Sequence, residues 1–175
     1  MINSKGKIIL ISGGARSGKS SMALDFAKNS KSPFYIATGW AGDEEMAARI
    51  AKHQIERGER WKTIEERFFI SSSIEKAVAS NADFIVVDCL TIWLSNMMLN
   101  DKDWLTELKK CLEFLEKSPH PVVVFVSNEV GCGIVPGDKV SREFRDNAGT
   151  VNKIFANFAD EVYLCFCGIP VKIKG

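Results

Sequence analysis

An eight-residue segment near the start of the chain carries the residue types needed to hold a nucleoside triphosphate. It fits the spacing G-x-x-x-x-G-K-[ST] and consists of Gly13, Gly14, Ala15, Arg16, Ser17, Gly18, Lys19 and Ser20. The small residues let backbone N–H groups curl around phosphates, and a helix that begins here points its positive end at them. We expect the whole segment to bind nucleotide, with Lys19 reaching the β- and γ-phosphates and Ser20 coordinating Mg²⁺.

The sequence on either side of this segment supplies the context that the motif requires. An apolar run at residues 8–11 precedes it, and an amphipathic helical pattern follows it. The alternative is a glycine-rich turn that binds nothing, and the strand–loop–helix context favours the phosphate-binding interpretation. The motif does not specify which phosphoryl chemistry follows.

Asp88 is a second candidate site residue, because it ends the apolar run at residues 84–87. Phosphate-loop proteins place an acidic residue that holds Mg²⁺ at this position. The alternative is an aspartate that caps the next helix through its side chain. The sequence favours the metal role, so Ser20 and Asp88 are the predicted Mg²⁺ ligands.

His53 is the candidate nucleophile of a predicted helix that also carries Arg49 and Arg57. These three residues are four positions apart, so they rise along one side of the helix. A histidine at an apolar boundary is more often a hydrogen-bonded core residue, but two nearby cations would keep the ring neutral and nucleophilic toward phosphorus. The arginines could also neutralise phosphate oxygens in the transition state. We assign no chemistry to the other histidine, His120, which lies between two prolines.

A glycine-containing segment at residues 128–136 follows a strand that ends in Val126 and Ser127. Ligands of α/β proteins bind at the carboxyl edge of the sheet, where this segment would emerge. It is either a loop of the site or a long turn that needs glycine only for its geometry, and residue chemistry leaves both interpretations open.

Composition limits the class of protein. The chain has 175 residues, 46% of them hydrophobic, and a net charge of +1, which is typical of one globular domain spanning 1–175 and gives no case for binding nucleic acid. Its five cysteines show no C-x-x-C pair, so neither a disulfide framework nor a zinc site is expected. The N-terminus lacks the pattern of a signal peptide, and polar residues interrupt the longest apolar stretch, so the sequence predicts a cytoplasmic location without a membrane span.

Strand-like and helical patterns alternate along the chain, which predicts an α/β fold with a mostly parallel central sheet covered by helices. The expected strands lie at about residues 8–12, 34–38, 68–71, 84–88, 122–127 and 161–167. The expected helices lie at about residues 19–29, 43–58, 73–80, 90–99, 102–117 and 138–159. A turn at residues 168–170 then predicts a C-terminal edge strand or hairpin. The apolar stripe of the last helix would face the sheet or another subunit.

With these segments assembled, the chain resembles the bifunctional adenosylcobinamide kinase / adenosylcobinamide-phosphate guanylyltransferase family of cobalamin biosynthesis, over essentially its whole length. The stretches that carry the resemblance are residues 13–20, 35–38, 43–50 with His53, 61–65, 88–91, 127–131, 133–136 and 144–149. Several of them are more specific than a phosphate loop alone. The resemblance implies a RecA-like P-loop fold.

The resemblance also implies two reactions. The first is phosphorylation of the aminopropanol hydroxyl of adenosylcobinamide by ATP or GTP, and the second is transfer of GMP from GTP to that phosphate. His53 matches the position that becomes guanylylated, so that one displacement between anions becomes two steps at a nucleophile. Family members can form homotrimers, which implies a homo-oligomer here.

The predicted nucleotide-binding set contains the phosphate loop and, in addition, Thr38, Arg57, Glu65 and Asp88. Glu65 and Asp88 match family positions expected near the guanine nucleotide or its metal. One departure from the family is the Thr38-Gly39-Trp40 segment, whose effect we expect to be confined to its loop. The competing hypotheses are a nucleotide-hydrolysing switch or motor and a nucleotide-sensing protein without a phosphoryl acceptor. No Asn-Lys-x-Asp element of a guanine-specific switch and no basic stripe of a nucleic-acid motor is found.

Overall fold

The computed structural model describes residues 5–40, 42 and 44–175. The described side chains exclude those of Glu45, Met46, Arg49, Ile50, Lys52, His53 and Glu56. The strands are β1 (Ile8–Gly13), β2 (Pro33–Ala37), β3 (Lys62–Glu65), β4 (Phe84–Asp88), β5 (Val122–Val126), β6 (Glu161–Phe166) and β7 (Ile169–Lys174). The helices are α1 (Lys19–Phe26), α2 (Glu44–Arg57), α3 (Ile70–Ala79), α4 (Leu90–Leu99), α5 (Trp104–Lys117) and α6 (Lys139–Phe158).

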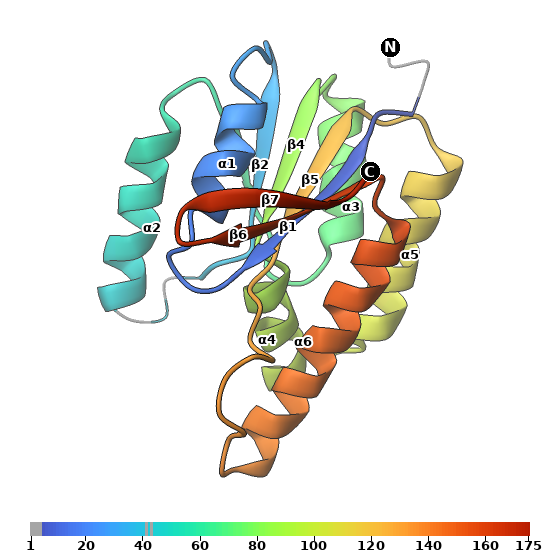
Figure 1. Cartoon of the computed structure of the whole chain (residues 1–175). Helices are drawn as coiled ribbons and strands as arrows, with labels where there is room; N and C mark the ends of the chain where they lie inside the picture. Colours follow the sequence, from blue (N-terminus) through green and yellow to red (C-terminus); the bar gives the residue numbers. More distant parts are fainter. Residues whose placement is uncertain (1–4, 41, 43) are drawn as a thin grey trace.

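The described strands form one sheet in the order β3-β2-β4-β5-β1-β6-β7 (Figure 1). Neighbouring strands are parallel except β6 and β7, which form an antiparallel hairpin at the edge. The predicted α/β fold with a C-terminal hairpin is therefore confirmed. No helix within the described residues is long and apolar enough to cross a membrane.

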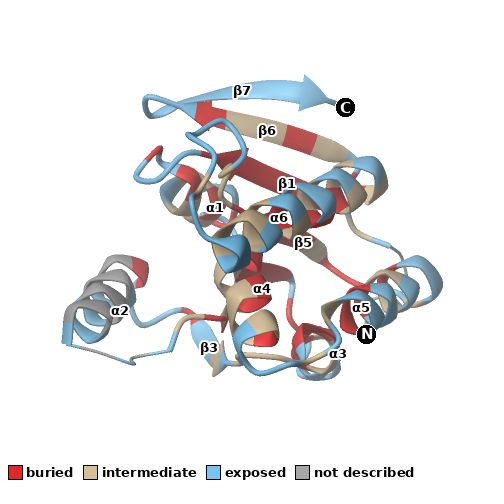
Figure 2. Ribbon diagram, turned by 90° about the horizontal axis from the view of Figure 1, so that it is seen from below, coloured by how far each residue is buried: buried red, intermediate tan, exposed pale blue. Residues whose placement is uncertain are grey.

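Alternate residues of the central strands face two separate apolar layers, as the pleat of a strand requires. Ile8 and Leu10 belong to the layer covered by α3, α4, α5 and α6, whereas Ile9 and Ile11 belong to the layer covered by α1. Both faces of β1 are buried, while β7 is exposed along its length (Figure 2). Burial on both faces explains why the central strands are apolar at every position.

The strand predicted at 68–71 is wrong, because the strand of this region is β3 and α3 begins at Ile70. The backbone amides of Phe68 and Phe69 donate hydrogen bonds of 2.8 and 2.9 Å to a carboxylate oxygen of Glu66. These bonds turn the chain where the apolar run suggested a strand. The true strand is polar and mostly exposed, so it shows no apolar pattern.

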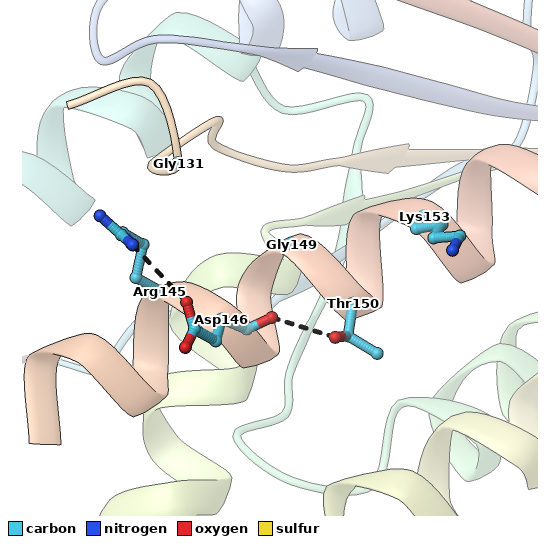
Figure 3. Close-up of a pocket in the computed structure, with 6 residues that line it drawn as sticks. All are labelled: Gly131, Arg145, Asp146, Gly149, Thr150 and Lys153. Atoms are coloured by element: carbon cyan, nitrogen blue, oxygen red, sulfur yellow. Dashed lines mark hydrogen bonds and ion pairs between the residues drawn. The ribbon is translucent and has the colours of Figure 1, made fainter. Parts of the chain in front are cut away.

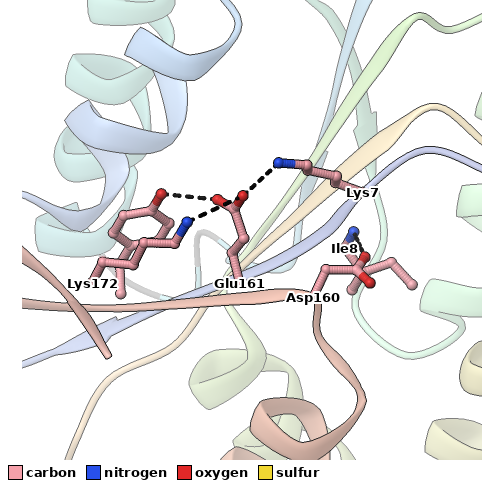
Figure 4. A network of polar contacts seen from close by, with 6 residues as sticks. Lys7, Ile8, Asp160, Glu161 and Lys172 are labelled. Carbon is pink, nitrogen blue, oxygen red and sulfur yellow. Dashed lines mark hydrogen bonds and ion pairs between the residues drawn. The ribbon is translucent and has the colours of Figure 1, made fainter. Parts of the chain in front are cut away.

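The hairpin is joined to β1 by a polar network centred on Glu161 (Figure 4). The Glu161 carboxylate accepts a hydrogen bond of 2.6 Å from Lys7 and one of 2.9 Å from the Tyr163 hydroxyl, and Lys172 lies 3.3 Å away. These donors, Lys7 foremost, lower the pKa of Glu161 to about 2. A single carboxylate thus links three neighbouring strands.

The register of the sheet brings several predicted site residues to one edge. Glu65 pairs with Ala37, which pairs with Asp88, which pairs with Val126. The phosphate loop leaves β1 at the same carboxyl edge, where ligands of α/β sheets bind. The fold therefore gathers at one edge residues that are far apart in sequence.

Candidate active site

The phosphate loop has the backbone conformation that its glycines permit. Gly13 ends β1 with φ 147°, and Gly18 precedes α1 with φ 92°. A Cβ atom on Gly13 would collide with the backbone carbonyl oxygen of Cys165 on the neighbouring strand β6. Gly14 and Arg16 are exposed in the loop, so the face that a phosphate would approach is open.

Lys19 is buried at the start of α1, and its ammonium group reaches back over the loop. The Lys19 Nζ donates to the carbonyl oxygen of Gly14 at 2.5 Å and to the Ser17 hydroxyl at 3.4 Å. Burial, and then the charge of Asp88, raise the pKa of the Cys89 thiol to about 12, and the positive charge of Lys19 opposes this shift. The phosphate loop itself therefore holds the ammonium group of Lys19.

Asp88 is half-buried at the end of β4. The Tyr35 hydroxyl donates a hydrogen bond of 2.6 Å to its Oδ2 atom. Burial and then the Asp88 charge raise the pKa of Tyr35 well above its ordinary value, which keeps the phenol protonated and donating. The residue that caps α4 is Cys89, with no hydrogen bond from a capping side chain, so the alternative role of Asp88 as a helix cap is not observed.

Thr38 fixes the backbone of Cys89, the residue that follows Asp88. Its side chain is fully buried, and its hydroxyl accepts from the Cys89 amide at 2.7 Å and donates to the Cys89 carbonyl at 2.8 Å. Asn96 donates to the Thr38 carbonyl at 2.8 Å. The hydroxyl therefore shapes the strand end, while a direct contact of Thr38 with nucleotide stays a prediction.

The helix α2 contains the backbone of His53, whose side chain lies outside the described residues. Arg57, in the last turn of α2, is buried with its guanidinium 3.8 Å from the centre of the Tyr35 ring. Trp61 packs edge-on against the same ring, with centroids 5.9 Å apart. Arg57 thereby anchors α2 to the tyrosine that holds Asp88.

Glu65 is exposed at the end of β3, two strands away from Asp88 at the same edge. Neighbouring strands lie about 4.8 Å apart, which separates the two backbones by roughly 10 Å. The structure therefore places the phosphate loop, Asp88 and Glu65 along one edge.

The segment after β5 is tied to the phosphate loop and to two helices. The Glu129 amide donates to the Gly13 carbonyl at 2.9 Å, and the Asn128 amide donates to the Thr91 hydroxyl of α4 at 2.7 Å. Asn152 of α6 accepts from the Ser127 hydroxyl at 2.6 Å and donates to the Asn128 carbonyl at 3.1 Å. These contacts favour a loop of the site over a simple turn.

Beside this loop lies an open pocket of about 360 Å³ (Figure 3). The residues that line it are Gly131 of the loop and Arg145, Asp146, Gly149, Thr150 and Lys153 of α6. Sequence reasoning assigned no role to this pocket, although residues 144–149 carry part of the resemblance. Two chain segments form it, and no single pattern in the sequence marks such a junction.

Sequence reasoning also gave no role to Tyr35, Asn96 or Asn152. Their hydroxyl and amide groups orient other groups, and spacing along the chain does not reveal partners that lie between 24 and 58 residues away. A polar residue at the border of an apolar stripe, as Asn152 is beside Val151 and Phe155, is the one signal that could have marked it.

Ser20 and Asp88 offer the hard oxygen donors that Mg²⁺ prefers. Within the described part of the chain, no group of three or more histidine, cysteine, aspartate or glutamate side chains could hold a metal ion. This is consistent with Mg²⁺, which takes one or two protein ligands and completes its shell with water and phosphate oxygens. The residues present therefore fit a nucleotide-bound Mg²⁺.

The profile described as cobinamide kinase / cobinamide phosphate guanyltransferase matches residues 9–173. The chain belongs to this family of enzymes. Among similar curated proteins is the bifunctional adenosylcobalamin biosynthesis protein CobP of Pseudomonas aeruginosa, 39% identical over 169 residues, which cover 95% of this chain and 96% of that protein. CobU of Escherichia coli, which bears the same description, is 38% identical over 182 residues, covering 95% of this chain and 99% of its own length.

Solved structures confirm the fold of this family member. The flagellar accessory protein FlaH of Methanocaldococcus jannaschii has a TM-score of 0.57 at 16% identity, covering 98% of this chain and 79% of FlaH. The RadB recombinase has a TM-score of 0.53 at 16% identity, covering 92% of this chain and 74% of RadB. The predicted RecA-like P-loop fold is thereby confirmed.

Proposed function

We propose that this chain phosphorylates adenosylcobinamide with ATP or GTP and then transfers GMP from GTP to the product, which gives adenosylcobinamide-GDP in cobalamin biosynthesis. Family membership supports the two activities. The observation that carries the proposal is the row formed by the phosphate loop, Asp88 and Glu65 at one edge of the sheet. We treat residues 1–175 as one catalytic domain.

In the kinase step, the loop amides and Lys19 bind the phosphates of the donor. The acceptor hydroxyl oxygen forms a bond to the γ-phosphorus. At the same time the bond between the γ-phosphorus and the bridging oxygen breaks, and the nucleoside diphosphate leaves. Ser20 and Asp88 would hold Mg²⁺, which neutralises charge on the phosphate oxygens. Tyr35 keeps the Asp88 carboxylate oriented through its 2.6 Å hydrogen bond.

In the guanylyl step, a neutral ring nitrogen of His53 attacks the α-phosphorus of GTP, and pyrophosphate leaves. A phosphate oxygen of the acceptor then attacks the same phosphorus, and the histidine leaves unmodified. Arg57 is proposed to offset phosphate charge, and Glu65 to contact the guanine nucleotide. Because Arg57 packs on the Tyr35 ring, the helix that carries the nucleophile is linked to the residue that orients Asp88.

We further propose that the chain acts in the cytoplasm, where nucleoside triphosphates are available, and as a homo-oligomer that could be a trimer. The edge hairpin leaves several large apolar side chains between half and three quarters exposed, namely Phe166, Ile169, Val171 and Ile173. Several exposed apolar side chains gathered on one edge hairpin are typical of a protein contact.

Transfer of label from γ-³²P-ATP to adenosylcobinamide tests the kinase assignment. We expect acceptor-dependent labelling of the corrinoid by the wild-type chain and its loss in Lys19→Ala, which removes the cation at the phosphates. Hydrolysis of ATP that is indifferent to the corrinoid would instead support a nucleotide-hydrolysing switch. Nucleotide binding without either reaction would support a sensor.

A further inference from the structure

The pocket between the β5–α6 loop and α6 lies beside the proposed kinase site, and nothing in the two-step mechanism uses it. We propose that this pocket receives an amide side arm of the corrinoid acceptor. The inference rests on the proposed function, and it names the place where the acceptor docks. Figure 3 shows Arg145, Asp146, Thr150 and Lys153 along α6, with the Arg145 side chain extending toward the loop at Gly131.

The wall of the pocket is joined to the phosphate loop by a very short connection. The Glu129 amide bonds to the carbonyl of Gly13, the first residue of the phosphate loop. Gly131 follows two residues later, and its amide donates to the Glu129 carboxylate at 2.6 Å. Two residues span at most about 7 Å, so the pocket wall lies close to the bound phosphates. An acceptor that presents its hydroxyl to the γ-phosphate therefore has its remaining parts within reach of the pocket.

The part of α6 that lines the pocket, which we call its floor, is fixed to the same loop. Asn152 of α6 bonds to both Ser127 and Asn128, and it lies about one helical turn beyond Gly149. Wall and floor therefore keep a constant distance from each other and from the phosphate loop. A docking site that must position a hydroxyl needs this rigidity.

The side chains of the pocket suit an amide. Asp146 accepts hydrogen bonds, and Arg145, whose Nε lies 3.7 Å from its Oδ1, donates them. Among the described residues no carboxylate pairs with Lys153, so a further donor is available to a ligand. A primary amide offers both a donor and an acceptor, and cobinamide carries such amides around its ring.

The pocket is large enough for a side arm of the corrinoid and too small for its ring. A volume of about 360 Å³ holds a side chain of the ligand but not a macrocycle. The same loop exposes Ile134 and Val135, with 95% and 59% of their surface accessible. These side chains give the ring an apolar surface outside the pocket.

Packing does not explain why position 149 of α6 is a glycine. It lies in the interior of the 20-residue helix α6, where glycine is less favourable than alanine. Apart from its chain neighbours and the nearby backbone of α6 itself, no described atom lies within 4 Å of the position that its Cβ would occupy. Close packing therefore does not require glycine here, and its effect is to keep the floor of the pocket open.

Gly149→Leu fills the pocket and tests the inference, with Asn157→Leu, an exposed position of the same helix outside the pocket, as the matched control. Binding of adenosylcobinamide is measured by equilibrium dialysis through its visible absorption, and binding of ATP is measured in parallel. We expect the affinity of Gly149→Leu for the corrinoid to fall by roughly tenfold or more. The affinity for ATP should not change, and Asn157→Leu should match wild type in both.

Equal corrinoid affinity of Gly149→Leu and wild type would overturn the docking site, as would an equal loss in Asn157→Leu. Because dialysis needs no turnover, it separates the two proposals. A wild-type chain that binds the corrinoid at the pocket but transfers no phosphate would refute the proposed kinase step alone. A wild-type chain that transfers phosphate while Gly149→Leu binds normally would refute the docking site alone.

Discussion

At the scale of single residues, the geometry around Asp88 depends on neighbouring side chains and backbone groups that hold it in place. The carboxylate of Asp88 has one described side-chain donor, Tyr35, and that ring is itself held between Arg57 and Trp61. The nearby Thr38 hydroxyl bonds to both polar groups of the Cys89 backbone. The carboxylate is therefore already oriented in the structure, which would lower the entropy cost of binding the proposed Mg²⁺.

Tyr35→Phe should weaken the use of Mg²⁺ without removing a nucleotide contact. A hydrogen bond to a charged group is worth about 1.5–3 kcal/mol, so we expect the Mg²⁺ concentration for half-maximal kinase rate to rise by roughly ten- to a hundredfold. The measurement is the kinase rate as a function of Mg²⁺ at saturating ATP. Tyr163→Phe, which removes the other tyrosine hydroxyl that bonds a carboxylate, is the control. An unchanged Mg²⁺ dependence in Tyr35→Phe would show that the hydrogen bond does not position Asp88.

At the scale of elements, sequence reasoning succeeded where burial on both faces imposes an apolar run. The strands β1, β4 and β5 are of this kind, and the phosphate loop follows from its motif. Sequence reasoning failed at β3, because an exposed edge strand needs no apolar run. It also failed at Phe68–Ile70, where a backbone hydrogen bond to the Glu66 carboxylate turns the chain. The pocket and the contacts of Asn152 join separate segments, which no local pattern records.

The helix α3 depends on a carboxylate from another element. Glu107 of α5 is buried and accepts a hydrogen bond of 2.9 Å from the Ser71 amide in the first turn of α3, whose own cap residue Phe69 offers no side-chain bond. Glu107→Ala should lower the free energy of unfolding by about 1–3 kcal/mol, because it leaves a buried amide without its acceptor. Urea unfolding measures the change. Glu113→Ala, an exposed position of α5 that pairs with the exposed Lys117, should lose at most about 0.5 kcal/mol. Equal losses in both variants would contradict the role of Glu107.

At the scale of the whole molecule, the proposed site residues lie at the carboxyl edge of the sheet, and the hairpin of β6 and β7 forms one lateral edge. The turn between β6 and β7 brings Gly168 close to Gly18, so the hairpin borders the phosphate loop. Glu161 of β6 pairs with Lys7, which directly precedes β1, and with Lys172 of β7 (Figure 4). The contacts of Glu161 therefore hold in place the hairpin whose turn borders the phosphate loop.

The contacts of Glu161 make the free energy of unfolding depend on pH, and the sign of this dependence follows from the depressed pKa of Glu161. The folded pKa of about 2 lies below the ordinary value of 4.5, so the stabilisation is complete above about pH 4.5 and is lost as the pH falls toward 2. We expect the difference in unfolding free energy between wild type and Glu161→Gln to be constant from pH 5 to 7 and to shrink at lower pH. Urea unfolding across this range measures it. A difference that grows on acidification would contradict the assignment.

The covalent histidine is the central claim of the account, and one labelling experiment tests it most directly. The purified protein is incubated with α-³²P-GTP and Mg²⁺ without corrinoid and then separated by denaturing electrophoresis, alongside His53→Ala and Gln54→Ala, an exposed neighbour on the same helix. We predict acid-labile, base-stable label on wild type and Gln54→Ala and none on His53→Ala, which should still phosphorylate the corrinoid. Label that persists in His53→Ala, or no label on a wild-type protein that binds GTP, would contradict the His53–GMP intermediate.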